Sequence, residues 1–187
     1  MPGTTSSASP LPSHVDLLVA FTNSIDHELG TDDLTTPAEL TRWLVDHGLL
    51  ARSTRSTPED LALARRLRDG LHVALVAHHD GEEDAGALVE AADELPLQLA
   101  VAGGRPSLAP AQDGVRGALG QVLVAVTDAT ADDTWPRLKI CAADDCRWAY
   151  VDTTKNRSRA WCEWGCGNKA KTRSYRARKK AAAARWP

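Results

Sequence analysis

Four cysteines are the residues of this chain whose type and spacing most directly indicate a chemistry. The chain contains no other cysteine, and the four form two close pairs, Cys141-x4-Cys146 and Cys162-x3-Cys166, with fifteen residues between the pairs. Two pairs of thiolates at such a spacing are typical of a structural Zn2+ site, in which four ligands surround the ion tetrahedrally. We therefore predict that all four cysteines bind one structural Zn2+.

Disulfides and free thiols are the alternatives to zinc. The first fourteen residues contain neither the basic nor the apolar segment of a secretory signal, and no apolar run is long enough to span a membrane. We expect a cytoplasmic protein without a membrane partner, and a reducing cytoplasm favours metal binding over disulfides. All six histidines lie within the first 79 residues, so the site is all-cysteine unless a distant histidine folds over it.

Charge is distributed unevenly along the chain. Residues 1–136 contain 8 Lys and Arg against 21 Asp and Glu, whereas residues 137–187 contain 14 against 4, which indicates an acidic unit joined to a basic one. The cations gather between and after the cysteine pairs, in the electrostatic pattern of a nucleic-acid-binding surface. The alternative is a basic segment that is merely solvated, or that docks on the acidic unit. The predicted nucleic-acid contacts are Lys155, Asn156, Arg157, Arg159, Asn168, Lys169, Arg173, Arg176, Arg178 and Lys179.

Helices must supply most of the acidic unit. Apolar residues recur at steps of three and four, which predicts helices over residues 13–30, 37–48, 57–79, 82–94 and 112–129. The helix at residue 37 has the clearest start, because Thr36 and Glu39 form a capping box and Pro37 occupies the first helical position. Gly70 lies inside a predicted helix and indicates close packing there. Alternation over residues 97–109 around Gly103-Gly104 predicts a β-hairpin.

The basic unit is expected to fold around the metal. Residues 147–152 are predicted to form a strand, residues 153–158 a turn and residues 169–185 a helix, so that Cys166 lies at the start of the helix, as in a treble clef. The predicted fold is α+β. It comprises a disordered segment over residues 1–12, a mostly helical domain with a small β-hairpin over residues 13–133, and a four-cysteine, treble-clef-like zinc finger with a long basic helix over residues 134–187.

The residues around the cysteines resemble a known family. Cys141-x4-Cys146, Asp152-Thr-Thr-Lys-Asn-Arg-Ser-Arg-Ala-Trp-Cys162 and Cys166-Gly-Asn-Lys169 are similar to the CGNR zinc finger. Bacterial proteins of this family place the finger behind a helical domain called ABATE, and the segment Leu18-x-x-Phe21-x-Asn23-Ser-Ile-Asp26 resembles the start of that domain. The chain departs from the family at Lys169 and Ala160, where arginine is usual. Lysine carries the charge but cannot form the bidentate contact of arginine.

The resemblance implies a regulator of transcription that is linked to stress. The leading hypothesis is a regulator that binds double-stranded DNA through its zinc finger and basic helix, while its N-terminal domain senses a small molecule or forms a homodimer. Asn23 and Asp26, which we place inside the first helix, are the candidate ligand-binding residues. An RNA- or ribosome-associated module and a protein-interaction module are the alternatives. We find no catalytic motif in the sequence and do not expect an enzyme.

Overall fold

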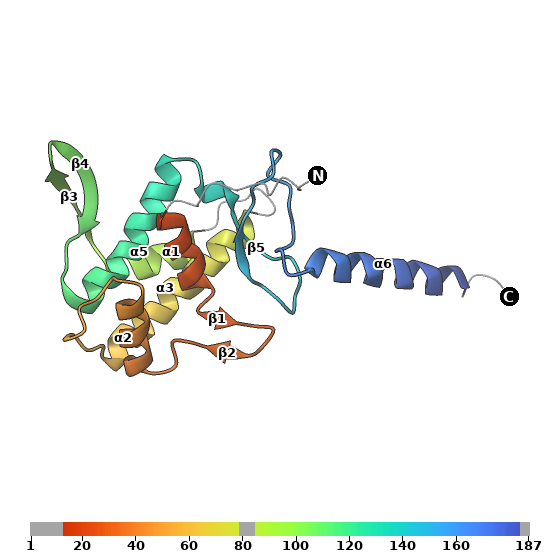
Figure 1. Ribbon diagram of the computed structural model, residues 1–187, viewed down its shortest axis with the longest axis horizontal. Coiled ribbons are helices and arrows are strands. Elements are labelled where there is room, and N and C mark those ends of the chain that lie inside the picture. The colour runs from red at the N-terminus through yellow and green to blue at the C-terminus, as the bar shows by residue number, and fades with distance from the viewer. Residues whose placement is uncertain (1–12, 79–84, 184–187) are drawn as a thin grey trace, which may run out of the picture.

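The computed structural model describes residues 13–78 and 85–183, and it has the predicted α+β fold (Figure 1). The segment predicted to be disordered, residues 1–12, lies outside the described residues, as do residues 79–84 between two predicted helices. Within the described ranges, no helix is both long and apolar enough to cross a membrane. The helices of the N-terminal part are α1 (Ser13–Thr22), α2 (Pro37–Asp46), α3 (Pro58–Ala77), α4 (Gly86–Ala92) and α5 (Gly114–Ala131).

The starts of α2 and α3 follow from the local sequence. Their N-cap residues, Thr36 and Thr57, each accept a hydrogen bond from the backbone N–H three residues later, at Glu39 and Asp60. The two acidic side chains accept hydrogen bonds from the N-cap backbone in return, which completes both capping boxes. A proline follows each N-cap, where an N–H would have no partner within the helix. Both helices begin where the sequence predicts.

The first helix is shorter than predicted. It ends at Thr22 rather than near residue 30, and the chain continues into a small antiparallel hairpin of β1 (Ile25–Asp26) and β2 (Thr31–Asp32). The Ser24 hydroxyl donates to the Phe21 carbonyl at 2.8 Å, and the Asn23 amide is engaged by a distant part of the chain. Such side chains compete with the helical backbone for hydrogen bonds and favour an end to the helix. Asn23 and Asp26 therefore follow the helix, and the prediction that they lie inside it was wrong.

A buried ion pair holds the β1–β2 hairpin against α3. The guanidinium of Arg68 donates to both carboxylate oxygens of Asp32, at 2.7 and 2.9 Å, and to the hydroxyl of Ser24 at 3.1 Å. Arg68 is buried, so loss of Asp32 would leave the charge of Arg68 without a partner in the protein interior. The hairpin is therefore fixed in place, although each strand has only two residues.

The sequence indicated close packing at Gly70, and α3 and α4 approach each other there. A Cβ atom at this position would lie 2.8 Å from the backbone of Leu88 in α4, closer than real side chains approach a backbone. The glycine therefore lets the two helices pack at a distance that alanine would not allow.

The predicted β-hairpin forms after α4. Its strands are β3 (Leu97–Ala102) and β4 (Arg105–Pro110), and Gly103-Gly104 joins them with positive φ angles of 58° and 77°, as a type I′ turn requires. The base of the hairpin packs on α5, where Pro110 would lie 3.0 Å from a Cβ atom on Gly120. The strands extend beyond the helices at one end of the molecule (Figure 1).

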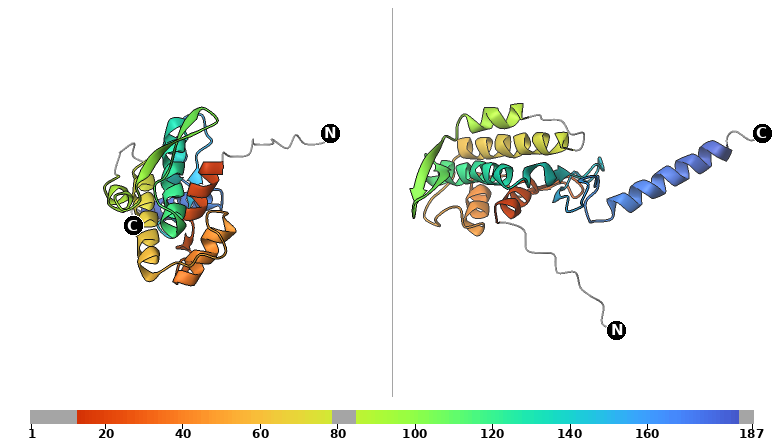
Figure 2. Two further views of the ribbon diagram at one scale, coloured as in Figure 1. Left: turned by 90° about the vertical axis from the view of Figure 1, so that its left-hand side faces the viewer. Right: turned by 90° about the horizontal axis from the view of Figure 1, so that it is seen from above.

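The C-terminal part is a short hairpin followed by a long helix. Strand β5 has three residues, too few to show a period, and was not predicted from the sequence. The last helix extends away from the body of the molecule, at the end opposite the β3–β4 hairpin (Figure 2). The elements of this part are the 3-10 helix η1 (Trp135–Arg137), the antiparallel strands β5 (Leu138–Ile140) and β6 (Ala149–Val151), and α6 (Cys166–Ala183).

One apolar core runs through both parts of the chain. Leu138, Ile140 and Ala149 of the β5–β6 hairpin are buried in the same cluster as the apolar faces of the helices. A second, smaller cluster contains the four cysteines and Tyr150. The β5–β6 hairpin thus contributes to both clusters, and the boundary predicted at residue 133 precedes an element that the two parts share.

Candidate metal centre and nucleic-acid interface

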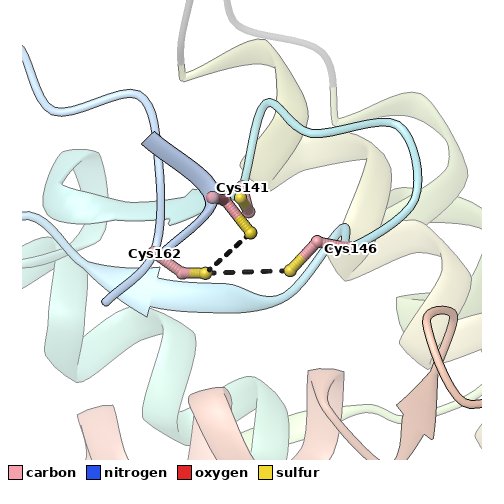
Figure 3. Close-up of side chains that lie close together, drawn as sticks. Cys141, Cys146 and Cys162 are labelled. Carbon is pink, nitrogen blue, oxygen red and sulfur yellow. Dashed lines mark hydrogen bonds between the residues drawn. The ribbon is translucent and has the colours of Figure 1, made fainter. Parts of the chain in front are cut away.

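The four cysteines converge beside the β5–β6 hairpin, and Figure 3 shows three of them directed toward a common centre. All four are buried, and their sulfur atoms lie within 4.8 Å of one another. The Sγ–Sγ distances from Cys162 to Cys146 and from Cys162 to Cys166 are both 3.7 Å. A tetrahedral Zn2+ with bonds of about 2.3 Å places its sulfur ligands about 3.8 Å apart, whereas a disulfide needs about 2.05 Å. The four cysteines form a zinc-binding site, as predicted, and among the described residues no histidine joins them.

The backbone around the sulfur atoms favours thiolates. The N–H groups two residues after Cys141 and Cys146 donate hydrogen bonds to the respective sulfurs, and the N–H of Cys162 also donates to Cys141. Arg147 has a left-handed φ of 53°, which turns the chain sharply after the second ligand. Hydrogen bonds to the ionised form of a group stabilise that form, so these turns hold two of the ligands ready for a cation.

The fourth ligand lies at the start of the basic helix. Cys166 is the first residue of α6, as the sequence predicts, and Gly165 before it has a φ of 84°, which other residues rarely adopt. The unpaired N–H groups and the dipole of a helix N-terminus favour negative charge on the thiolate. The metal centre therefore fixes the base of α6.

Protons compete with the metal for these sulfurs. Burial raises the pKa of the Cys166 thiol to about 11, and it also raises the pKa of Cys146. At Cys141, burial acts in the same direction, but hydrogen bonds from backbone N–H groups outweigh it and lower the pKa. Binding of Zn2+ must therefore displace protons from buried thiols, and the affinity of the site for zinc falls as the pH falls.

A side chain from the N-terminal part completes the β5–β6 hairpin. The amide Nδ2 of Asn23 donates to the carbonyl of Ala149 at 2.9 Å, and the Ala149 N–H donates to Oδ1 of Asn23 at 2.7 Å. Asn23 thus pairs with β6 much as a neighbouring strand would. The residue before Ala149, Trp148, accepts a hydrogen bond from the N–H of Cys141 at 2.8 Å. The N-terminal part is therefore attached to the segment that orients the first two zinc ligands.

Two family models match the two parts of the chain. Residues 137–179 match the CGNR zinc finger, and residues 15–135 match ABATE, described as "Putative stress-induced transcription regulator". The chain belongs to the ABATE family. No curated protein matches it. The predicted resemblance is thereby confirmed, and the hydrogen bonds of Asn23 connect the opening segment of this ABATE domain to the zinc finger.

One buried carboxylate organises the tip of the zinc-finger hairpin in this ABATE protein. Oδ2 of Asp152 accepts hydrogen bonds from Nζ of Lys139 at 3.1 Å and from the N–H of Arg159 at 2.8 Å, and Oδ1 accepts one from the N–H of Thr154 at 2.9 Å. Burial alone would raise the pKa of Asp152, but a hydrogen bond from the Thr154 hydroxyl, together with these bonds, outweighs it and lowers the pKa to about 2. Asp152 was noted only as part of the family motif, with no structural role, and Lys139 was not singled out from the sequence. The Asp-x-Thr spacing, which is typical of a turn stabilised by the aspartate side chain, was the available signal.

Four of the predicted nucleic-acid contacts lie in ion pairs with acidic side chains. The pair of Lys169 connects α6 to the β1–β2 hairpin of the ABATE domain, and the hydrogen bond and charge of its partner raise the pKa of Lys169. The side chains in the two pairs that involve α6 are about half exposed. The pairs are Lys169 with Glu28 (2.9 Å), Arg173 with Asp145 (3.1 Å), Arg159 with Glu163 (3.1 Å), and Arg157 with Asp133.

Five of the other predicted contacts are open to solvent. Lys155 and Asn156 are exposed at the hairpin tip, and Asn168 is exposed in the first turn of α6. Further along α6, Arg176 and Lys179 are exposed, as is Lys171, which was not among the predicted contacts. In the described part of the chain these three cations make no ion pair. The side chain of Arg178 lies outside the described residues.

The two candidate ligand-binding residues line different cavities. Asn23 lines a cavity of about 600 Å³ together with Trp43 and Trp148, but its amide is already bonded to β6. Asp26 lines a second cavity, of about 420 Å³, and its carboxylate accepts a hydrogen bond from the N–H of Leu29 at 2.9 Å. A small-molecule site formed by Asn23 and Asp26 stays a prediction, and their present partners are within the protein.

Proposed function

We propose that this ABATE protein is a non-enzymatic regulator of transcription in the cytoplasm that binds double-stranded DNA through α6. One observation carries the proposal: the metal centre fixes the base of α6, which extends away from the rest of the molecule (Figure 1) and has exposed cations along its length. Cations gathered on one element neutralise phosphates and release counterions, which supplies most non-specific affinity for DNA. The remainder of the molecule repels DNA, because residues 1–136 have thirteen more acidic than basic side chains.

The ion pairs of α6 leave this proposal intact. Lys169 and Arg173 are paired, but the pairs are about half exposed, and solvent screens such pairs so that they contribute little to stability. A phosphate can therefore replace Glu28 or Asp145 at little cost. The first turns of α6 then contribute to binding only after this exchange, whereas Arg176 and Lys179 are available at once.

The shape of the module suits a DNA groove. A major groove about 12 Å wide admits one α-helix, and α6 extends from the body over a length of 18 residues. The hairpin tip presents Lys155 and Asn156, and asparagine can form a bidentate contact with adenine. Lys169 replaces the usual arginine, so it contributes charge but no bidentate contact.

The test is a pair of matched double variants. Arg176→Ala with Lys179→Ala removes two unpaired cations from α6, and Arg42→Ala with Arg52→Ala removes two exposed cations from the ABATE domain. Binding to a mixed-sequence duplex is measured by fluorescence anisotropy over a series of salt concentrations. If both α6 residues contact phosphates, the first variant binds more weakly and its salt slope is flatter by about two units. The second variant binds as the parent does. Equal behaviour of the two variants would refute the proposal.

Two exposed aromatic side chains support a second candidate function, binding of RNA or single strands. Trp164 is 74% exposed beside the metal centre, and Tyr175 is 62% exposed on α6. Unpaired bases stack on such side chains, each with about 1–3 kcal/mol. Competition between duplex DNA and single-stranded RNA of equal length separates the candidates, since Trp164→Ala weakens only single-strand binding. If the protein binds neither duplex DNA nor single-stranded RNA, the result favours the third candidate, a protein-interaction module.

A further inference from the structure

The β3–β4 hairpin has an exposed apolar face that the function proposed above does not use. Leu99 is 70% exposed, Val101 is 67% exposed and Leu108 is 41% exposed. Leu99 pairs directly with Leu108 across the hairpin, and Val101 lies two residues along the same strand, so the three side chains share one face. An isolated two-stranded hairpin is marginally stable in water, and this one extends beyond the helices (Figure 2).

The hydrogen-bond register shows which backbone groups point outward from this hairpin, and no described residue pairs with the outward groups of β3. The Ala111 N–H donates to the Pro96 carbonyl at 2.9 Å, which identifies these residues as a hydrogen-bonded pair. Hydrogen-bonded and non-hydrogen-bonded pairs alternate along antiparallel strands, so the pairs of Leu99 and Val101 are of the second kind. The backbone N–H and C=O groups of Leu99 and Val101 therefore point outward from β3, where they can pair with another strand.

The other edge is blocked. The outward-facing positions of β4 include Pro106 and Pro110, which have no N–H to donate. Proline at such positions prevents a further strand from pairing, so the hairpin can extend on the β3 side only.

We propose that β3 pairs with β3 of a second copy of this chain, in antiparallel orientation, and forms a four-stranded sheet across a two-fold axis. With the axis beside Ala100, Leu99 of each copy lies opposite Val101 of the other, so that the outward backbone groups exchange hydrogen bonds. The apolar faces of the two hairpins then form one continuous surface. A two-fold interface needs the same patch on both partners, and a strand with this sequence satisfies that condition by itself.

Charge favours a second copy over other partners. Residues 97–110 contain Arg105 as the only charged residue, whereas residues 1–136 as a whole have a large excess of acidic side chains. Two acidic bodies therefore repel each other least when they meet through this hairpin. The strand also has no charged side chain that would select a different, oppositely charged protein. Helix α6 lies at the opposite end of the molecule and stays free in the dimer (Figure 1).

Sedimentation analysis of the full-length, zinc-loaded chain tests the dimer. We expect the parent to be dimeric and both Leu99→Lys and Val101→Lys to be monomeric, because each change brings a lysine of one copy close to the same lysine of the other across the paired strands, where like charges destabilise pairing. Leu29→Lys is the matched control, since Leu29 is 75% exposed on a different hairpin and its substitution leaves the dimer intact. A parent that is monomeric over the accessible concentration range would overturn the proposal, as would a dimer that Val101→Lys leaves unchanged.

A cysteine at the axis tests the register. In the proposed pairing, Ala100 of one copy lies opposite Ala100 of the other at a non-hydrogen-bonded position. The Cα atoms of such a pair are about 4.5 Å apart, so two cysteines there can form a disulfide. Mild oxidation should therefore link Ala100→Cys chains into covalent dimers, whereas Ser107→Cys, on the blocked strand, stays unlinked. Linkage of Ser107→Cys but not of Ala100→Cys would overturn the pairing through β3. Neither experiment contains DNA, so its result is independent of the proposed function.

Discussion

Replacing Asn23 with alanine measures how firmly the ABATE domain holds the zinc finger. The change removes the hydrogen bonds of 2.9 and 2.7 Å between Asn23 and the peptide groups of Ala149, which is 1% exposed. Each buried polar group without a partner costs about 1–3 kcal/mol. Because Asn23 is only half-buried, water can replace part of what is lost. We expect the free energy of unfolding to fall by about 2–3 kcal/mol.

Two measurements report this loss. Urea unfolding of the zinc-loaded protein, followed by circular dichroism, gives the change in the free energy of unfolding. Transfer of zinc to a coloured chelator gives the rate at which the finger opens, and we expect faster transfer because Ala149 belongs to the strand after the first two ligands. Asn168→Ala is the control: the side chain is exposed and has no hydrogen bond in the described part of the chain, so both measurements should match the parent.

An Asn23→Ala variant whose free energy of unfolding lies within about 0.5 kcal/mol of the parent's, the range of ordinary surface substitutions, would show that Asn23 does not hold the zinc finger. Asn23→Asp adds a second check. Its carboxylate can still accept the Ala149 N–H but would face the Ala149 carbonyl with a negative oxygen. It should therefore be at least as unstable as the alanine variant, and an aspartate variant as stable as the parent would show that the pairing contributes nothing.

Four further outcomes are expected. Gly70→Ala should lower the free energy of unfolding by about 1–2 kcal/mol. The overlap of the new methyl group with α4 costs about 1–3 kcal/mol, which exceeds the gain of up to about 1 kcal/mol in helix propensity. Urea unfolding measures the net change. Asp152 has a pKa of about 2 in the folded protein against 3.8 ordinarily, so its contribution of about 2 kcal/mol is complete above pH 4 or so and is lost as the pH falls toward 2. Asp152→Asn should flatten this part of the stability–pH curve. A chain that ends at Ala131 lacks the buried side chains of β5 and β6 and should unfold at a lower temperature than the full chain, as calorimetry can show. Chelation of zinc should become easier as the pH falls toward 6, because burial raises the pKa of Cys166 to about 11 and protons displace the metal; metal analysis after dialysis against chelator checks this.

Features that depend on neighbours in the chain could be predicted from the sequence. Thr36 and Glu39 lie three residues apart, so their capping box is local and marks the start of α2 without reference to the rest of the fold. The turn at Gly103-Gly104 is equally local. The zinc site could be predicted because each cysteine pair has a local spacing and four thiolates are a typical ligand set of structural Zn2+.

Features that depend on distant residues could not be predicted. The sequence around Asn23 is apolar at helical steps, but the structure ends the helix there because its partner, Ala149, lies far along the chain. Which cations of α6 form ion pairs could not be predicted either. Their spacing predicts one charged face, yet only the fold brings Glu28 within 2.9 Å of Lys169 and so separates paired cations from free ones.

The hydrogen bond between Asn23 and Ala149 joins residues 126 positions apart, so Asn23 is synthesised long before its partner. Helices α1 to α5 leave the ribosome first, and domains generally fold from the N-terminus during synthesis. Their apolar cluster, however, is completed only when β5 and β6 arrive. Part of this apolar cluster therefore stays uncovered in the nascent chain until β5 and β6 have been made, and the metal centre is incomplete until Cys166 follows. Zinc holds the smaller cluster that borders the same hairpin, so we expect the metal-free chain to be cut by proteases faster than the zinc-loaded chain.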